Sequence, residues 1–220
     1  MFQMPDYKRN QIEAAISSVL EPRLKEPSSE LRTRLKRLLE TDRVVGRVPR
    51  SGNPERANYA FYSAEAPGSG VEVWFSEYEA FALLNGLRLM MHGWPQGFAV
   101  SIMRRVRPEL EKQHVRILKQ DRNWLFDQQA IRQKAKEGDM AFDNRDPVLL
   151  TIVSKPGAAA GAQGQPHRCA ICRGPNEAAR FASEGHVGGS AWTMFELVGV
   201  AHRLSEKLAV TEPRRRGRGG

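Results

Sequence analysis

The sequence predicts a mixed α+β protein that is mostly helical. Apolar residues recur at helical spacing through the first two thirds of the chain, interrupted by two short aromatic and β-branched runs around a Pro-Gly-Ser-Gly turn. After about residue 143, short strand-like runs alternate with helical segments. The chain has 40% hydrophobic and 27% charged residues, which is ordinary for a globular protein.

The first two helices are predicted over residues 8–20 and 28–42. Ser28 or Ser29 caps the second helix, whose leucines recur at helical spacing. Four basic residues stand between these leucines, so this helix has an apolar side and a cationic side: Arg32, Arg34, Lys36 and Arg37. Residues 43–56 contain two prolines, two glycines and four arginines and are predicted to form a basic loop.

A β-hairpin is predicted from residues 57–63 and 71–76. Ser76 and Glu79 have the spacing of a capping box, which opens a helix over 77–92 that ends at Gly93. This helix is expected to direct four side chains inward: Phe81, Leu84, Leu87 and Met91. Three more helices are expected over 96–107, 108–121 and 124–138, with Pro108 in the first turn of one and Asn123 capping the last.

The remaining third of the chain has the order β-β-α-β-α. Strands are predicted over 148–153, 168–173 and 191–197, and helices over 176–184 and 200–209. Residues 155–166 have the small-residue composition of a linker. We therefore expect a DNA-binding domain at 8–106, a helical connector at 107–142, a small α+β domain at 143–211 and a basic tail at 212–220.

The order of two helices, a hairpin and further helices resembles the DNA-binding domain of the MerR family. The local likeness is best over Trp74–Arg105, where Trp74-Phe75-Ser76 opens a helix containing Leu83-Leu84 and Leu87-Arg88-Leu89, followed by Gly93. Upstream, Gln11–Ala15 and Leu31-Arg32 resemble the family's first helix and the entry to its recognition helix. The resemblance covers about residues 10–120. It implies a winged-helix, helix-turn-helix protein that binds double-stranded DNA sequence-specifically, regulates transcription and forms a homodimer.

The charge balance points to a polyanionic partner. The chain has 34 Lys and Arg against 25 Asp and Glu, a formal net charge of +9. A cationic helix carrying Arg32, Arg34, Lys36 and Arg37 fits the major groove, and the loop is expected to supply phosphate contacts through Arg47, Arg50 and Arg56. The alternative for the helix is an ordinary solvated face.

The basic tail resembles the Arg-Gly-Arg core of an AT-hook, with Gly219 where the hook has proline. Such a segment can lie in a narrow minor groove. The expected contacts are Arg214, Arg215, Arg216 and Arg218. The alternative is a tail that only improves solubility.

The sequence shows no sign of catalysis, a cofactor or a metal. Cys169 and Cys172 lie inside a predicted strand and point to opposite faces, without the second ligand pair of a structural zinc site. No nucleophile elbow or phosphate-binding loop is present, so no enzymatic activity is expected. With no apolar run long enough for a membrane span or secretion signal, we expect a cytoplasmic, nucleoid-associated protein.

Homodimerisation is also expected from the apolar residues of the connector, and the C-terminal domain is expected to bind a protein or a small molecule. The connector residues are Leu110, His114, Ile117, Leu118 and Leu125. Two other functions remain open. One is binding of single-stranded DNA or RNA by the tail and the hairpin aromatics Tyr59, Phe61, Tyr62, Trp74 and Phe75. The other is a non-catalytic interaction module of a phage- or plasmid-encoded assembly that binds an acidic protein.

Overall fold

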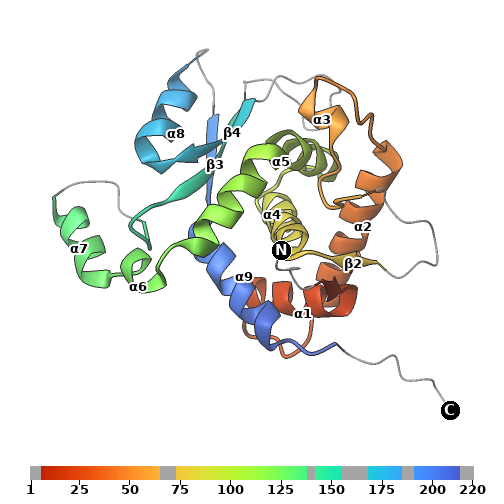
Figure 1. Ribbon diagram of the computed structural model, residues 1–220, viewed down its shortest axis with the longest axis horizontal. Coiled ribbons are helices and arrows are strands. Elements are labelled where there is room, and N and C mark those ends of the chain that lie inside the picture. Colours follow the sequence, from red (N-terminus) through yellow and green to blue (C-terminus); the bar gives the residue numbers. More distant parts are fainter. Residues whose placement is uncertain (1–5, 65–72, 138–141, 155–167, 185–190, 214–220) are drawn as a thin grey trace. The chain divides into compact units, whose positions relative to one another are not determined.

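The computed structural model describes residues 6–64, 73–137, 142–154, 168–184 and 191–213 (Figure 1). These residues form a mixed α+β structure that is mostly helical with small antiparallel sheets, as expected. The chain divides into two compact units, residues 1–105 with 203–220 (unit 1) and residues 106–202 (unit 2). None of the described helices is both long and apolar enough to cross a membrane.

Unit 1 is built on three helices that pack against one another, α1, α2 and α4. Their bounds are Arg9–Leu20, Ser29–Val45 and Glu77–Met91. The unit also contains the short helix α3 (Pro54–Ala57), the strands β1 (Tyr7–Lys8) and β2 (Trp74–Phe75), and the start of α5 (Gln96–Lys119). The predicted first two helices are confirmed, and Ser28 caps α2 by accepting a hydrogen bond from Leu31 N at 3.1 Å.

The helix α4 is the centre of unit 1 (Figure 1). Every residue from Tyr78 to Leu87 is buried, since other elements surround this helix, and the two polar residues of the run, Glu79 and Asn85, form hydrogen bonds. Gly86 is needed here, since a Cβ at this position would lie 2.9 Å from the ring of Phe61. The Ser76–Glu79 capping box is confirmed. Met91, expected to point inward, is 52% exposed because it is the last residue of the helix, next to its C-cap His92.

The predicted β-hairpin is wrong in its first strand. Residues 58–64 form no strand, and β2 pairs instead with β1 in antiparallel register, Tyr7 opposite Phe75 and Lys8 opposite Trp74. The Pro-Gly-Ser-Gly turn lies outside the described residues. Residues 57–63 therefore form no hairpin wing, and the winged-helix arrangement stays a prediction.

Two buried carboxylates explain this difference because they take the backbone donors that a strand would need. Asp42 on α2 accepts hydrogen bonds from Ala60 N at 3.0 Å and Phe61 N at 2.9 Å. Glu79 on α4 accepts from Ser63 N and, at 2.7 Å, from Ser76 N. The segment 60–63 is therefore fixed to two helices.

Asp42 also forms the buried ion pair of unit 1. Arg104 on α5 donates from Nε to Asp42 Oδ1 at 2.6 Å, from Nη2 to the Asp42 carbonyl at 2.5 Å and from Nη1 to the Gly46 carbonyl at 2.7 Å. Both side chains are almost fully buried, at 2% and 0% exposure. The pair thus joins α2, α5 and the segment 60–61 at one point.

The two helices predicted over 96–107 and 108–121 are one helix, α5, with Pro108 inside it. Proline in a helix interior removes one backbone hydrogen bond and crowds the preceding turn. Pro108 itself is exposed, whereas Val106, Arg107 and Leu110 around it are buried. We attribute the continuous helix to this burial on both sides of the proline, which outweighs the missing hydrogen bond.

Unit 2 contains the three-stranded antiparallel sheet β4-β3-β5. The strands are β3 (Val148–Ser154), β4 (Arg168–Arg173) and β5 (Ala191–Glu196). The helix α8 (Gly174–Ser183) follows β4, and α9 (Val198–Val210) begins after β5 in unit 2, while its residues from Arg203 on belong to unit 1. The predicted β-β-α-β-α order is confirmed. The central strand β3 is buried from Val148 to Val153, and α8 packs on it and on β4. Cys169 and Cys172 lie on β4, and burial raises the pKa of the Cys172 thiol.

The single helix predicted over 124–138 is instead α6 (Arg122–Leu125) and α7 (Gln128–Lys136). Each begins at an aspartate whose side chain accepts backbone hydrogen bonds, Asp121 from Asn123 N at 2.9 Å and Asp127 from Gln129 N at 3.0 Å. Asn123 is therefore not the cap. Asp127 divides the predicted segment because a capping residue is not itself helical, and Asp121 starts α6 two residues before the predicted beginning.

The apolar residues expected to form a dimer seam are mostly buried within the chain. Leu110, His114, Ile117 and Leu125 are each no more than 1% exposed, and Leu118 is half-buried. Within this structure these residues therefore pack inside the chain, and homodimerisation stays a prediction.

Removing one partner of the buried ion pair should be strongly destabilising. Asp42→Ala leaves the Arg104 guanidinium buried without its carboxylate, so we expect the free energy of unfolding to fall by about 3–5 kcal/mol. Arg105→Ala is the control, because it breaks a partly exposed pair with Glu55 and should cost less than about 1 kcal/mol. Urea unfolding followed by circular dichroism measures both values. Equal losses in the two variants would contradict a special role for Asp42.

His114 should make stability depend on pH. Burial, assisted by the nearby His202, lowers its pKa to about 4 from 6.5. Below pH 6.5 the unfolded chain binds a proton that the folded chain does not, so stability present at neutral pH is lost as pH falls, by up to about 3 kcal/mol near pH 4. The difference in unfolding free energy between wild type and His114→Gln, measured from pH 7.5 to 4, should shrink accordingly. A constant difference would rule out the lowered pKa.

Candidate nucleic-acid interface

The cationic helix predicted from the sequence is α2, and its local structure fixes which sides face solvent. Leu31, Leu35, Leu38, Leu39 and Asp42 are buried and define its inner side. The N-terminal end is held by Glu21, which accepts from Ser28 Oγ at 2.6 Å and from Ser17 Oγ at 3.2 Å. The basic residues therefore lie on the remaining, outer sides of a well-anchored helix.

The four predicted cations do not share one face. At about 3.6 residues per turn, Arg32 and Lys36 fall on one side of the buried face, together with Arg43 (the lysine flank). Arg34 and Arg37 fall on the other side, in line with Thr41, Val44 and Val45 (the valine flank). A binding partner that approaches α2 from one side therefore contacts the cations of one flank before those of the other.

The basic segment after α2 is ordered rather than a free loop. Gly46 ends the helix with a φ of 63°, a conformation that favours glycine, and its carbonyl accepts from Arg104. Val48 N then donates to the Arg56 carbonyl at 2.7 Å. These contacts hold the segment close to the end of α2.

The short helix α3 is attached to α5 by one carboxylate. Glu55 accepts from Ser101 Oγ at 2.5 Å and from Arg105 Nη2 at 2.7 Å. Asn53 caps this helix by accepting from Glu55 N at 3.0 Å. Residues 47–56 therefore lie in a fixed position beside α2, within unit 1.

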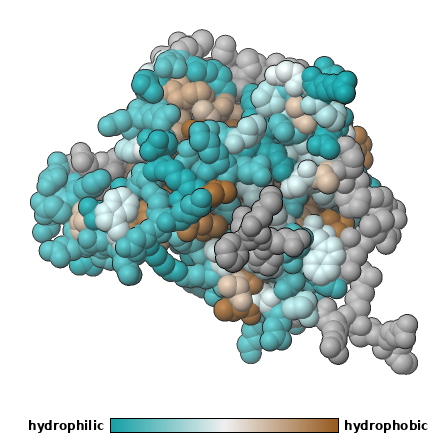
Figure 2. All heavy atoms as spheres, in the orientation of Figure 1, coloured by the Kyte–Doolittle hydropathy of each residue, from teal (hydrophilic) through white to brown (hydrophobic). Residues whose placement is uncertain are grey.

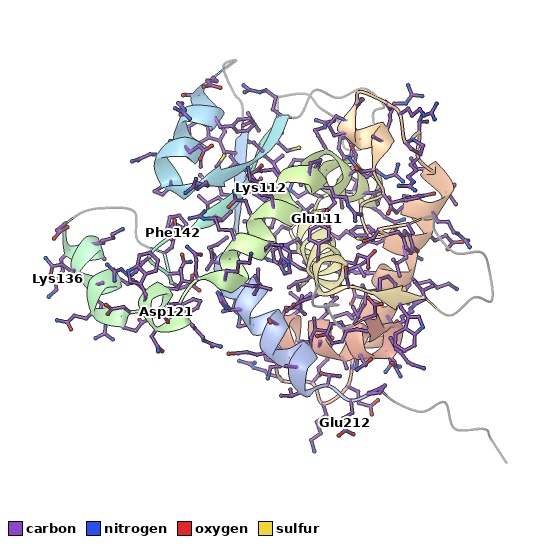
Figure 3. All side chains as sticks on the ribbon, in the orientation of Figure 1. Glu111, Lys112, Asp121, Lys136, Phe142 and Glu212 are labelled. Atoms are coloured by element: carbon purple, nitrogen blue, oxygen red, sulfur yellow. The ribbon has the colours of Figure 1, made fainter. Side chains whose placement is uncertain are left out.

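Some of the basic side chains already have partners. Arg34 binds Glu30 at 2.5 Å, Arg32 lies 3.8 Å from Glu26, and Arg47 lies over the ring of Tyr59 at 5.3 Å. Four others make no side-chain hydrogen bond, ion pair or ring contact within the described parts of the chain: Lys36, Arg37, Arg50 and Arg56. All four are exposed, and sticks ending in nitrogen project from α2 and α3 in Figure 3.

The acidic residues of the same region leave most of this charge uncompensated. Residues 29–57 contain eight Lys and Arg and four Asp and Glu. Two of the four carboxylates, Asp42 and Glu55, are bound to Arg104 and Arg105, which lie outside the region. The local excess of positive charge is thus larger than the composition indicates, as an interface for a polyanion requires.

The five aromatic residues expected as candidates for base stacking are mainly core residues. Tyr59, Phe61 and Phe75 are at most 5% exposed, and Tyr62 is half-buried with its ring stacked on Phe75 at 6.2 Å. Trp74 is 48% exposed and has Lys8 over its ring at 4.9 Å. The structure therefore brings together no platform of exposed rings from these five residues.

Several residues of this surface were not predicted from the sequence. Arg43, Val44 and Val45 belong to α2 because the helix continues three residues past its predicted end. Gln96 from α5 reaches α2, where its Nε2 donates to Thr41 Oγ1 and to the Arg37 carbonyl. Helical periodicity extended to Val45 would have shown the first three, whereas Gln96 arrives through tertiary packing. The four predicted tail arginines, Arg214, Arg215, Arg216 and Arg218, lie outside the described residues.

Comparison of the chain with protein-family models, curated proteins and solved structures found no match.

We predict that Glu55 positions the basic segment with little effect on global stability. Glu55→Ala removes both contacts to α5, so amide exchange at Val48 and Arg56 should become faster. The free energy of unfolding should change by less than about 1 kcal/mol, because the ion pair is partly exposed. Glu30→Ala, which removes another exposed carboxylate from an arginine, is the control and should leave exchange in 48–56 unchanged. If the amide protons of Val48 and Arg56 exchanged at the wild-type rate in the Glu55→Ala variant, this role of Glu55 would be contradicted.

Proposed function

We propose that the protein binds double-stranded DNA through α2 and the basic segment 47–56, as a non-catalytic regulator of transcription. The observation that carries the proposal is the set of exposed basic side chains that make no side-chain hydrogen bond, ion pair or ring contact in the described parts of the chain: Lys36, Arg37, Arg50 and Arg56. A helix of this kind fits the width of the major groove, and flanking arginines hold phosphates and fix its register.

The rigidity of the surface supports the proposal. Phosphate contacts position a protein only if the groups that make them are held at fixed distances. In unit 1 the buried Asp42–Arg104 pair fixes the end of α2, and Glu55 fixes the following segment on α5. Little ordering of the backbone is therefore required when the cations bind, which favours affinity.

The lack of an exposed aromatic platform among the five candidate rings favours duplex over single strands. Binding of single-stranded nucleic acid commonly stacks bases on exposed rings. Of these five residues Trp74 alone is exposed, and its ring is already covered by Lys8. We propose regulation of transcription as the role because a rigid, basic helix surface suits recognition of a DNA duplex. It does not suit movement along a single strand.

The salt dependence of binding tests the proposal. Each phosphate contact contributes about −0.9 to the slope of log K against log salt on duplex DNA. Replacing Lys36, Arg37 and Arg50 with alanine should flatten that slope by about 2–3 units. A matched control removes the same charge from α7, where Arg132, Lys134 and Lys136 are exposed, Lys136 projecting from the helix in Figure 3. Fluorescence anisotropy with a labelled duplex and with its single strand measures the slopes.

The control triple variant should keep the wild-type slope. Equal flattening in both variants would mean that net charge alone attracts DNA and that α2 has no special part. Tighter binding to the single strand than to the duplex would instead favour the alternative function.

A further inference from the structure

Exposed aliphatic side chains are concentrated at the end of α2. Val44 is 76% exposed, Val45 63% and Val48 48%. Single exposed apolar residues are normal on a protein surface. Here, however, three of the eleven large hydrophobic residues exposed in the described parts of the chain fall within five positions. On the face shown in Figure 2, by comparison, hydrophobic residues form small patches separated by hydrophilic ones.

These valines lie among cations. Arg43 precedes Val44, and Arg47 and Arg50 stand on either side of Val48 and Pro49. By helical spacing Val44 and Val45 continue the valine flank, so the exposed Arg37 and then Thr41 lead directly to them. Whatever binds the cations of this flank therefore also reaches the two valines.

The charge around the valines indicates what kind of surface they meet. An aliphatic patch ringed by arginines requires a partner that is negatively charged overall and offers small apolar groups between its charges. Duplex DNA has this pattern in the major groove, where the C5-methyl group of thymine is the apolar feature of the base edges. Valine side chains have no π-face, so stacking on a base is excluded as their role.

We infer that Val44 and Val45 contact thymine methyl groups in the major groove and give the protein a preference for T·A pairs under the end of α2. This inference rests on the proposed function, because the cations of α2 must first place the helix in the groove. It assigns different roles to the charged and the apolar side chains of the valine flank. Arg37 holds the backbone, and the valines read the presence of a methyl group.

Uracil-substituted DNA tests the inference directly, because uracil differs from thymine only in lacking the C5-methyl group. The probes are a mixed-order duplex of A·T pairs and the same duplex with every thymine replaced by uracil. Wild-type protein should bind the uracil duplex more weakly, by about fourfold for each methyl group that the valines bury. The reverse probe adds 5-methyl groups to the cytosines of a G·C duplex, which should strengthen binding because the methyl occupies the equivalent position.

The variant Val44→Ser with Val45→Ser removes both methyl groups of each valine side chain, because a threonine methyl could still contact the thymine methyl. It should bind the thymine and uracil duplexes with nearly equal affinity. Val210→Ser is the matched control, since Val210 is also 76% exposed and lies at the end of α9. The control should discriminate between the two duplexes as wild type does. Circular dichroism confirms that each variant is folded.

The possible results separate this inference from the proposed function. Salt-dependent duplex binding without discrimination between thymine and uracil would overturn the inference and leave the function standing. Discrimination that survives in the double valine variant would also overturn it, because the methyl groups would then be read elsewhere. If the wild-type protein bound no duplex at all, both the inference and the proposed function would be overturned. That result would point to an acidic protein as the partner of the valines and arginines at the end of α2.

Discussion

The ion pair between Asp42 and Arg104 is the constraint on which unit 1 depends. Removing two charges from water is costly, and the cost is offset only when every donor and acceptor is satisfied. Here Asp42 accepts from Arg104, Ala60 and Phe61, while Arg104 also binds two backbone carbonyls. One interaction therefore sets the end of α2, the place of α5 and the path of the segment between them.

The same interaction bears on the candidate site. Because Arg104 and Arg105 satisfy the carboxylates of Asp42 and Glu55, the cations of α2 and of residues 47–56 are not needed to neutralise them. Among the described residues, the side chains of Lys36, Arg37, Arg50 and Arg56 are left without an acidic partner, as the proposed binding of DNA would use them. The protein thus separates the cations that stabilise the fold, which lie on α5, from the exposed ones on α2 and after it.

Periodicity in the sequence predicted much of the fold because helices and strands are local structures. The helices α1, α2 and α4, the capping box at Ser76 and the β-β-α-β-α order were predictable from residue spacing. The hairpin was not, because its donors are taken by Asp42 and Glu79, which are distant in sequence. The prediction that a new helix begins at Pro108 was wrong for a similar reason. The helix continues because residues on both sides of the proline are buried, and this burial depends on tertiary packing. For the candidate site, the sequence showed which residues are basic. The structure was needed to show that they divide into two flanks of α2 and that Gln96 donates a hydrogen bond to Thr41.

The close contact between Gly86 and Phe61 has a consequence for the evolution of this fold. A side chain at position 86 would collide with the ring of Phe61 and approach Leu38 to 3.3 Å. The sizes of the residues at 61 and 86 are therefore coupled, and a chain with alanine or serine at 86 should carry a smaller residue at 61. Because Phe61 also belongs to the segment held by Asp42, paired changes in size at these two positions would identify distant relatives that keep this segment on the central helix.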